Sequence, residues 1–173
     1  MKMILFGYRA CGKSTLGKRL ASESWEKLYD TDALVIQAFD GKTIREIWES
    51  HGEAAFREKE VEVTRQVCQI KSGVIALGGG TLMEAQAKQA VMDCEDAKKV
   101  YMYCQADELY RRLCLDQETG DSRPDLTEQG GLAEVEKMLA LRDPIYREVA
   151  DSVFDVTHLD EEKAYRYLMQ NHV

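Results

Sequence analysis

Short apolar runs recur along the chain and alternate with longer stretches in which apolar residues return every three or four positions. The short runs have the length and composition of buried β-strands, whereas the longer stretches have the period of α-helices. The predicted strands are residues 2–6, 28–31, 74–77, 100–104 and 152–156. Because helical stretches separate these five strands, the pattern predicts an α/β fold with a parallel sheet.

Two helical stretches lie in the first half of the chain. Residues 14–24 are predicted to form a helix that follows the first strand after a short loop. Further along, apolar positions recur at i, i+4, i+7, i+11 and i+14, with one acidic exception, in a series made of Phe56, Glu60, Val63, Val67 and Ile70. This spacing predicts a helix that packs one face against the sheet.

The second half of the chain contains two further predicted helices. Residues 132–150 have helical periodicity, and we expect a break at Asp143-Pro144 because proline removes a backbone donor. Residues 160–170 are predicted to form the last helix, with Tyr165, Leu168 and Met169 on its inward face.

The segment 116–131 differs from the rest of the chain because it has few apolar residues and contains Gly120, Pro124, Gly130 and Gly131. A polar insertion of this length in a compact domain is usually either functional or disordered. We interpret it as a lid that closes over a bound substrate, and disorder is the alternative.

The composition is that of one folded domain, which we expect to span residues 1–173. Of the 173 residues, 45% are hydrophobic, 31% are charged and two are proline. The net charge of −8 argues against general binding to nucleic acid or anionic membranes, so any anion site must be local. No stretch approaches the ~18 apolar residues of a membrane span, and we expect a cytoplasmic protein that acts as a monomer.

The cysteines and histidines do not predict a metal site. The five cysteines form no Cys-x-x-Cys pair, and the three histidines lie far apart in the sequence. We therefore expect reduced thiols and no structural zinc.

The strongest chemical signal is the segment 7–14, whose sequence GYRACGKS fits the phosphate-binding pattern G-x-x-x-x-G-K-[ST] between a strand and a helix. Backbone N–H groups of such a loop point into one concavity, where the helix dipole favours a polyphosphate. Lys13 would then reach the β- and γ-phosphates of ATP, and the Ser14 hydroxyl would bind Mg²⁺. A glycine turn that arose by chance is the alternative.

A pair of aspartates closes the second predicted strand. Because side chains alternate along a strand, Asp30 and Asp32 are expected to face the same cleft, with Thr31 pointing away. One carboxylate can hold the metal through water, and the other can accept a hydrogen bond from an attacking hydroxyl. Solvated turn residues are the alternative.

Glycines and arginines supply the remaining candidates. Gly78, Gly79 and Gly80 follow the third strand, where the absence of side chains lets a ligand approach the backbone; a flexible crossover is the alternative. Three arginines, Arg57, Arg123 and Arg142, occupy positions suited to bidentate recognition of a carboxylate or phosphate, although each could be a surface charge.

In this order, the motifs resemble those of the shikimate kinase family of P-loop enzymes, and the resemblance spans nearly the whole chain. The matching segments are 7–14, Asp30-Thr31-Asp32, 41–48, 52–57, Gly78-Gly79-Gly80, Arg123-Pro124 and 142–151. The resemblance implies ATP-dependent phosphorylation of the 3-hydroxyl of shikimate. It also implies a three-layer P-loop NTPase fold, in which a five-stranded parallel sheet has the P-loop strand at its centre and helices on both faces. A substrate-binding segment at about 33–60 and a mobile lid at about 116–131 complete the implied architecture.

The resemblance also assigns roles to individual residues. It implies that shikimate is the small-molecule partner, that Asp32 binds its hydroxyls and serves as the base, and that Arg57 and Arg142 hold its carboxylate. The backbone of Gly78, Gly79 and Gly80 would contact the ring hydroxyls, and Trp48 and Phe56 would wall the acceptor pocket. ATP would be bound by Arg9, Ala10, Cys11, Gly12, Lys13, Ser14 and Thr15, with Mg²⁺ held by Ser14 and Asp30. Lys13 and Arg123 would act on the phosphates during catalysis.

Three features depart from the family pattern. Ala10 replaces a glycine usual in the loop and would be strained if its φ is positive. Asp125 stands where an apolar lid residue is common. The lid also looks longer than usual, which leaves the adenine-stacking arginine without a certain counterpart; Arg112 is our choice.

Two other functions remain compatible with these residues. A gluconate kinase or a nucleotide-type kinase could share the scaffold. Gluconate would satisfy both the two carboxylate-binding arginines and the paired aspartates, whereas the triple glycine and the Asp-Thr-Asp motif favour shikimate. A nucleotide sensor without phosphoryl transfer is the second alternative, and the presence of every candidate catalytic residue argues against it.

Overall fold

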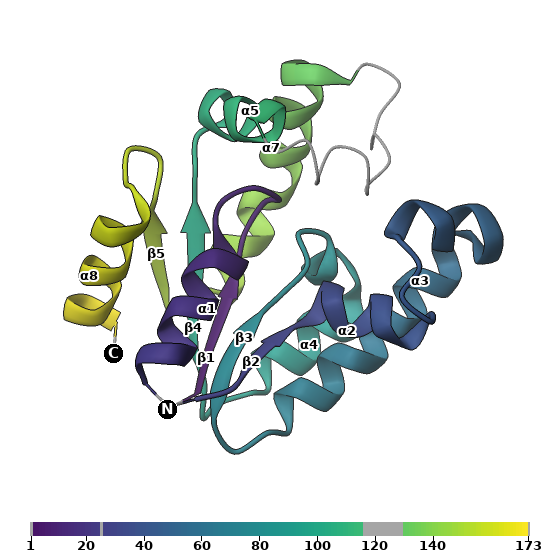
Figure 1. Cartoon of the computed structure of the whole chain (residues 1–173), viewed down its shortest axis with the longest axis horizontal. Coiled ribbons are helices and arrows are strands. Elements are labelled where there is room, and N and C mark those ends of the chain that lie inside the picture. The colour runs from purple at the N-terminus through teal and green to yellow at the C-terminus, as the bar shows by residue number, and fades with distance from the viewer. Residues whose placement is uncertain (1, 25, 116–129, 173) are drawn as a thin grey trace.

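The computed structural model describes residues 2–24, 26–115 and 130–172. Its centre is a sheet of five parallel strands in the order β2-β3-β1-β4-β5 (Figure 1). The strands are β1 Lys2–Phe6, β2 Leu28–Asp30, β3 Gly73–Ala76, β4 Lys98–Tyr103 and β5 Ser152–Asp155. The predicted sheet is confirmed, with strand limits that differ from the expected ones by at most two residues, and β1 lies in the middle.

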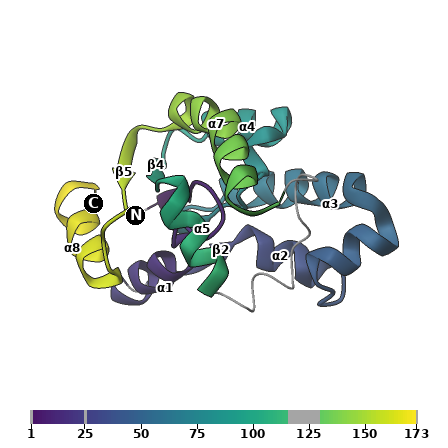
Figure 2. The ribbon, with the colours of Figure 1, turned by 90° about the horizontal axis from the view of Figure 1, so that it is seen from above.

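Helices cover both faces of the sheet. They are α1 Lys13–Glu23, α2 Thr31–Ala38, α3 Ile44–Cys68, α4 Ala85–Met92, α5 Ala106–Leu115, α7 Gly131–Val149 and α8 Glu161–His172, with a short 3₁₀ helix at Thr81–Met83. Viewed from above, the sheet lies between α1 and α8 on one side and α4 and α7 on the other (Figure 2). This arrangement confirms the predicted three layers.

Alternation along β1 builds two separate cores. Met3 and Leu5 face a cluster shared with α1 and α8, whereas Ile4 and Phe6 face a cluster shared with α3 and α4. Every residue of β1 is buried, as expected for the central strand of a parallel sheet. The carboxyl end of this strand, where the P-loop begins, is therefore rigidly held.

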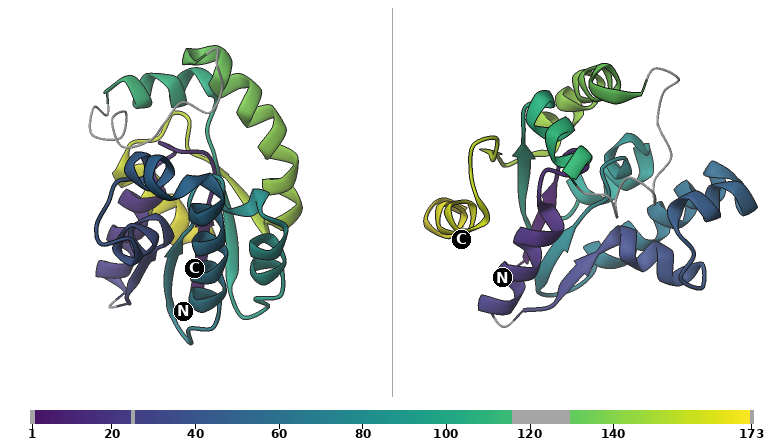
Figure 3. Two further views of the ribbon diagram at one scale, coloured as in Figure 1. Left: turned by 90° about the vertical axis from the view of Figure 1, so that its right-hand side faces the viewer. Right: turned by 45° about the horizontal axis from the view of Figure 1, so that its top comes forward.

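The helix α3 begins at a capping box and is kinked. Thr43 Oγ1 accepts a hydrogen bond from the Glu46 N–H, and the Glu46 side chain accepts one from the Thr43 N–H. At Gly52, φ is 83°, which divides the helix into two parts. The first part projects away from the sheet with the end of α2 (Figure 3).

The second part of α3 follows the predicted pattern except at its end. Phe56, Glu60, Val63 and Val67 are buried, as their spacing predicted. Ile70 lies beyond the helix, which ends at Cys68.

The break predicted at Asp143-Pro144 is wrong, because α7 continues through Pro144 to Val149. An interior proline usually costs about 3 kcal/mol. Here Arg142 and Tyr146 are buried on either side of it, and Asp143 accepts a hydrogen bond of 2.9 Å from Tyr101. Tertiary packing thus outweighs the local preference of proline.

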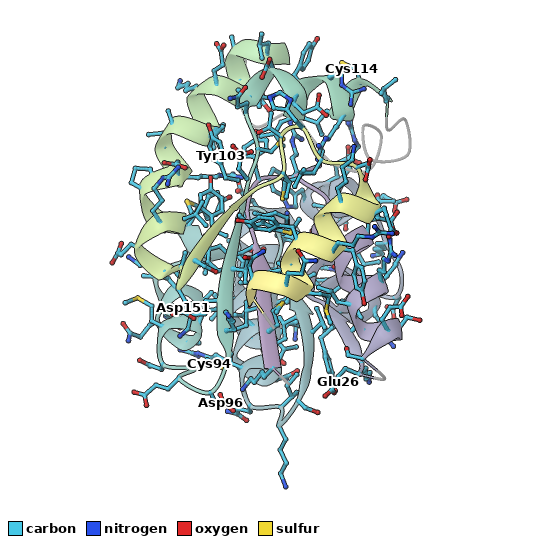
Figure 4. All side chains as sticks on the ribbon, turned by 90° about the vertical axis from the view of Figure 1, so that its left-hand side faces the viewer. Glu26, Cys94, Asp96, Tyr103, Cys114 and Asp151 are labelled. Atoms are coloured by element: carbon cyan, nitrogen blue, oxygen red, sulfur yellow. The ribbon has the colours of Figure 1, made fainter. Side chains whose placement is uncertain are left out.

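Within the three described ranges, no helix is both long and apolar enough to cross a membrane. All five cysteines have free thiols. Cys94 and Asp96 lie near one end of the sheet, whereas Cys114 lies near the other (Figure 4).

Candidate active site

The P-loop, residues 7–14, joins β1 to α1 in a conformation that requires unusual backbone angles. Gly12, the residue before α1, has φ 96°, and Ala10 has φ 64°, so the strain suspected at Ala10 is present. A Cβ on Gly7 would lie 2.5 Å from the Met102 carbonyl oxygen. The loop therefore packs closely on β4, and a side chain at Gly7 would collide with it.

Lys13 points back over this loop. Its Nζ donates hydrogen bonds to the carbonyl oxygens of Gly7 (3.0 Å) and Tyr8 (2.8 Å), and it lies 3.6 Å from Cys11 Sγ. The side chain is buried, so its charge is held at the loop. A phosphate at the loop would meet a cation already in position.

A cavity of about 280 Å³ lies in front of the loop. It is lined by Arg9, Ala10, Gly12, Lys13, Ser14, Thr15, Asp30, Asp32, Leu77 and Arg112. We call it the phosphate cavity. It brings most of the residues expected to bind ATP together with both aspartates of the Asp-Thr-Asp motif.

Ser14 and Asp30 form the part of the phosphate cavity that suits a hard cation. Ser14 Oγ donates to Asp30 Oδ2 over 2.5 Å, and Asp30 Oδ1 accepts from the Ala33 N–H. Among the described residues, no group of three or more His, Cys, Asp or Glu side chains could hold a metal alone. One hydroxyl and one carboxylate fit Mg²⁺, which typically takes its other ligands from phosphates and water.

Contrary to the prediction, Asp30 and Asp32 do not share one face of a strand, although both line the same cavity. The strand β2 ends at Asp30, which caps α2, and Asp32 lies in the first helical turn. Thr31 is buried, and its Oγ1 accepts a hydrogen bond from the Gly78 N–H. This bond fixes the start of α2 against the glycine segment.

A second cavity, which we call the acceptor cavity, adjoins the first. Its lining combines aromatic, cationic and anionic side chains with glycine backbone: Arg9, Asp32, Ile44, Trp48, Phe56, Arg57, Glu60, Gly79, Gly80 and Arg142. Trp48 and Phe56 pack edge to face, with ring centroids 6.2 Å apart. Every residue expected to bind the acceptor lines this cavity except Gly78.

The three glycines leave no room for side chains. A Cβ on Gly78 would lie 2.4 Å from Asp32 Oδ1, and one on Gly80 would lie 2.6 Å from a guanidinium nitrogen of Arg57. Gly78 thus packs behind Asp32 and does not face the cavity, whereas Gly79 and Gly80 do.

Arg57 is oriented by a carboxylate that the sequence analysis did not select. Its Nη1 donates to Glu60 Oε2 over 2.8 Å, and Thr81 Oγ1 donates to Glu60 Oε1 over 2.7 Å. Burial raises the pKa of Glu60, whose side chain is only 1% exposed, although Arg57 opposes this shift. Burial alone lowers the pKa of Arg57, but the charge and hydrogen bond of Glu60 together with the charges of Glu53 and Glu84 outweigh burial, and the pKa is raised. The signal in the sequence was an acidic residue on an otherwise apolar helix face.

Arg142 enters the acceptor cavity from α7. Its Nη1 donates to the Gly79 carbonyl oxygen over 3.2 Å, and its guanidinium carbon lies 5.4 Å from the centre of the Tyr8 ring. The residue is 5% exposed, and Arg142 Nε has no hydrogen-bond partner among the described residues. Buried donors seldom remain unpaired, so this nitrogen is available to a bound anion.

Arg9 reaches the same region from the P-loop itself. Its Nη2 donates to Glu134 Oε1 over 2.9 Å, and Glu134 lies in the first turn of α7 with a side chain that is 1% exposed. The sequence analysis expected Arg9 to bind ATP but did not identify Glu134.

A third cavity, of about 340 Å³, lies behind the P-loop between α5 and the start of α8. Cys11, Thr15, Met102, Arg112 and Asp160 contribute to its wall. Arg112 also lines the phosphate cavity, and its Nη2 donates to the Val156 carbonyl oxygen over 2.9 Å. Arg112 thus lies between the phosphate cavity and the third cavity.

The position of Arg112 is fixed by a neighbouring acid. Glu108 accepts hydrogen bonds from Arg111 and Arg112, and these contacts lower the pKa of Glu108 to about 2. Arg123 and Asp125 lie outside the described residues, as does most of the expected lid.

The fold and the site define a P-loop kinase that acts on a small anionic acceptor. A phosphate cavity with a lysine, two hydroxyl side chains and two aspartates adjoins a smaller cavity with three arginines and an aromatic wall.

Comparison with known proteins identifies the family. The sequence profile described as shikimate kinase matches residues 9–172. A shikimate kinase of Rhodopirellula baltica is 37% identical over 156 residues, which cover 90% of this chain and 82% of the relative. Shikimate kinase 2 of Photorhabdus laumondii is 35% identical over 172 residues, covering 98% and 95%. The chain belongs to the shikimate kinase family.

Solved structures give the same result. The shikimate kinase of Acinetobacter baumannii in complex with shikimate superposes with a TM-score of 0.86 at 27% identity, covering 98% of this chain and 90% of that one. The shikimate kinase of Bacteroides thetaiotaomicron superposes with a TM-score of 0.85 at 27% identity, covering 98% and 97%.

Proposed function

We propose that this chain transfers the terminal phosphate of ATP to the 3-hydroxyl of shikimate, with nucleotide and acceptor bound in the two adjoining cavities. One observation carries the proposal: Arg57 and Arg142 line the same cavity, and Asp32 lies at its border with the phosphate cavity. Membership of the shikimate kinase family supports the choice of acceptor.

Recognition of the acceptor rests on charge and shape. The guanidinium groups of Arg57 and Arg142 bind the shikimate carboxylate, because their planar forks match carboxylate oxygens in a pocket shielded from water. Trp48 and Phe56 cover the ring, and the backbone of Gly79 and Gly80 binds its hydroxyls. Gly78 keeps the space that Asp32 needs.

ATP is bound through the P-loop. The N–H groups of residues 9–15 and the Lys13 ammonium bind the phosphates, and Arg112 lies against the base. Ser14 and Asp30 would hold Mg²⁺, which neutralises charge on the β- and γ-phosphates when bound.

Asp32 accepts the proton of the attacking hydroxyl as the new P–O bond forms. The loose transition state requires alignment of the reactants and neutralisation of the phosphoryl charge more than covalent catalysis. The fixed cations therefore contribute most to the rate. Arg123 adds a further cation from the lid, and Arg123→Ala is then expected to lower turnover far more than ATP affinity.

The proposal extends to the whole chain. Residues 1–173 act as a single domain and as a monomer, and the reaction takes place in the cytoplasm. The substrate-binding segment at about 33–60 supplies five of the ten residues that line the acceptor cavity. The absence of a membrane-spanning helix from the described residues is compatible with this location.

Phosphorus NMR of the product, with purified protein, ATP, Mg²⁺ and shikimate, tests the proposal. The wild type is expected to form shikimate 3-phosphate. Asp32→Asn is expected to lower kcat by ~10² to 10⁴, because a general base typically contributes this factor, and to change the KM for ATP little. Asp93→Asn, an exposed aspartate at the end of α4, is the control. Wild-type turnover by Asp32→Asn would contradict the role of Asp32 as base.

A further inference from the structure

Among the described residues, Arg9 and Asp32 are the two that line both the phosphate cavity and the acceptor cavity. A phosphoryl group that passes from ATP to the acceptor crosses the border between these cavities. Asp32 is the anion at this border, and in the proposed function it accepts the proton of the attacking hydroxyl. Arg9 is the cation, and the proposed function gives its side chain no role in the transfer.

The Arg9 side chain is held firmly at this border. Its Nη2 is bonded to Glu134 Oε1 at 2.9 Å, and the side chains are 14% and 1% exposed. A Cβ on Gly79 would lie 3.1 Å from the Arg9 backbone nitrogen, so the P-loop also packs directly on the glycine segment. Arg9 is therefore fixed at its backbone by Gly79 and at its tip by α7.

Arg9 retains unused donors. A guanidinium has five N–H groups, and Arg9 Nε is buried without a hydrogen-bond partner among the described residues. Unpaired buried donors are rare in folded proteins and often mark a site where a ligand completes the hydrogen bonding. The ligand that reaches a cavity border between ATP and its acceptor is the phosphoryl group itself.

We propose that Arg9 donates hydrogen bonds to the equatorial oxygens of the transferring phosphoryl group, and that Glu134 is a positioning residue that acts through Arg9. This inference rests on the proposed function. The bond from the γ-phosphorus to its bridging oxygen breaks, with the electron pair leaving on ADP. A bond from the 3-hydroxyl oxygen to phosphorus forms, and the hydroxyl proton passes to Asp32. Arg9 keeps its protons throughout.

The buried partner determines which kinetic constant changes. Glu134 neutralises Arg9, so the pair adds little net charge that would attract ATP in the ground state. Fixed hydrogen-bond donors stabilise the transition state more than the ground state, because negative charge spreads over the phosphoryl oxygens in the transition state. Replacement of Arg9 is therefore expected to lower kcat and to leave the KM values for ATP and shikimate nearly unchanged.

The test uses a double variant, because Arg9→Met alone removes an ion-pair partner from a buried carboxylate and can fail to fold. Arg9→Met/Glu134→Gln removes both charges and preserves the approximate volume. We expect kcat to fall by ~10², as for removal of one preorganised donor, with both KM values within about threefold of wild type. Affinity for ADP, aluminium fluoride and shikimate together, a mimic of the transition state, is expected to fall by a similar factor.

A matched control is Arg19→Met/Glu162→Gln, which removes a cross-helix ion pair between α1 and α8 whose two residues line none of the three cavities. This control is expected to retain wild-type kinetics. Glu134→Gln alone keeps the arginine and is expected to lose less kcat than the double variant. Wild-type kcat in the Arg9→Met/Glu134→Gln protein, or a loss confined to KM, would overturn the proposal. Failure of the proposed function would instead appear in the wild type, as absence of shikimate-dependent ADP release.

Discussion

Two arginines from different elements converge on the acceptor cavity, and each is oriented by a different kind of partner. Arg57 is paired with the Glu60 carboxylate on its own helix, whereas Arg142 is bonded to the Gly79 carbonyl oxygen from α7. Neither arrangement satisfies all of the guanidinium donors. Both side chains can therefore bind a carboxylate without first breaking every bond that positions them.

Replacement of Arg57 by lysine tests this reading of the cavity. Arg57→Lys keeps the charge but loses the planar fork, and the loss of one charge-assisted hydrogen bond is expected to raise the KM for shikimate by ~10- to 100-fold. The KM for ATP should change little. Arg65→Lys, an exposed position further along α3, is the control for steady-state kinetics. Equal effects on both substrates would show that Arg57 is not specific to the acceptor.

Substitution of Glu60 is expected to affect acceptor binding more than stability. Its pKa is raised above the ordinary 4.5 because burial outweighs the attraction of Arg57, so the neutral form is the one that folding favours. We expect Glu60→Gln to retain wild-type stability at pH 7 to within about 1 kcal/mol, and to raise the KM for shikimate as Arg57 loses its anchor.

The pH dependence of unfolding gives a further check on Glu60. Just above pH 4.5 the folded protein keeps a proton that the unfolded chain has lost, so wild-type stability falls as pH rises through this window. The glutamine variant lacks this contribution, and its stability relative to wild type should rise over the same interval. Denaturant unfolding at several pH values measures the difference; a constant difference would contradict the raised pKa.

At the scale of elements, the P-loop was the most predictable part and also carries visible strain. The pattern of residues 7–14 predicted its position and its neighbours correctly, and the positive φ on which strain at Ala10 depends is present. The turn after β2 was less predictable, because a strand that ends at Asp30 cannot be distinguished by composition from one that continues to Asp32. Pro144 was misread because only the packing around α7 reveals why the helix continues.

Relief of the strain in the loop is measurable. A non-glycine residue in the left-handed region costs roughly 1–2 kcal/mol, and the added freedom of glycine in the unfolded chain offsets about 0.4–1 kcal/mol of this. Ala10→Gly is therefore expected to raise the free energy of unfolding by about 0.5 kcal/mol. Gly12→Ala, at φ 96°, should lower it. Denaturant unfolding of both variants measures these free energies. A lower free energy of unfolding for Ala10→Gly would show that Ala10 is not strained.

At the scale of the whole molecule, the site is an assembly of distant segments at the carboxyl edge of one sheet. The sequence analysis named most of its members, because phosphate loops, paired acids and glycine runs have recognisable patterns. Glu134 has no local signal, because it orients Arg9 through a contact between α7 and the P-loop. Glu60 was visible only as an acidic exception on an apolar helix face, and its role follows from its ion pair with Arg57 on the same helix. The central claim is therefore about convergence: two cavities must share a border where the hydroxyl meets the phosphate.

Acceptor selectivity tests this claim most directly. Purified wild-type protein with ATP and Mg²⁺ should be assayed for ADP release in parallel with shikimate, gluconate, nucleoside monophosphates and no acceptor. We expect shikimate alone to give rapid turnover, because only shikimate combines a carboxylate for Arg57 and Arg142 with a carbocyclic ring that fits the aromatic wall and a hydroxyl beside Asp32. Faster turnover with gluconate or a nucleotide, or ATP binding without release of ADP in the presence of shikimate, would contradict it.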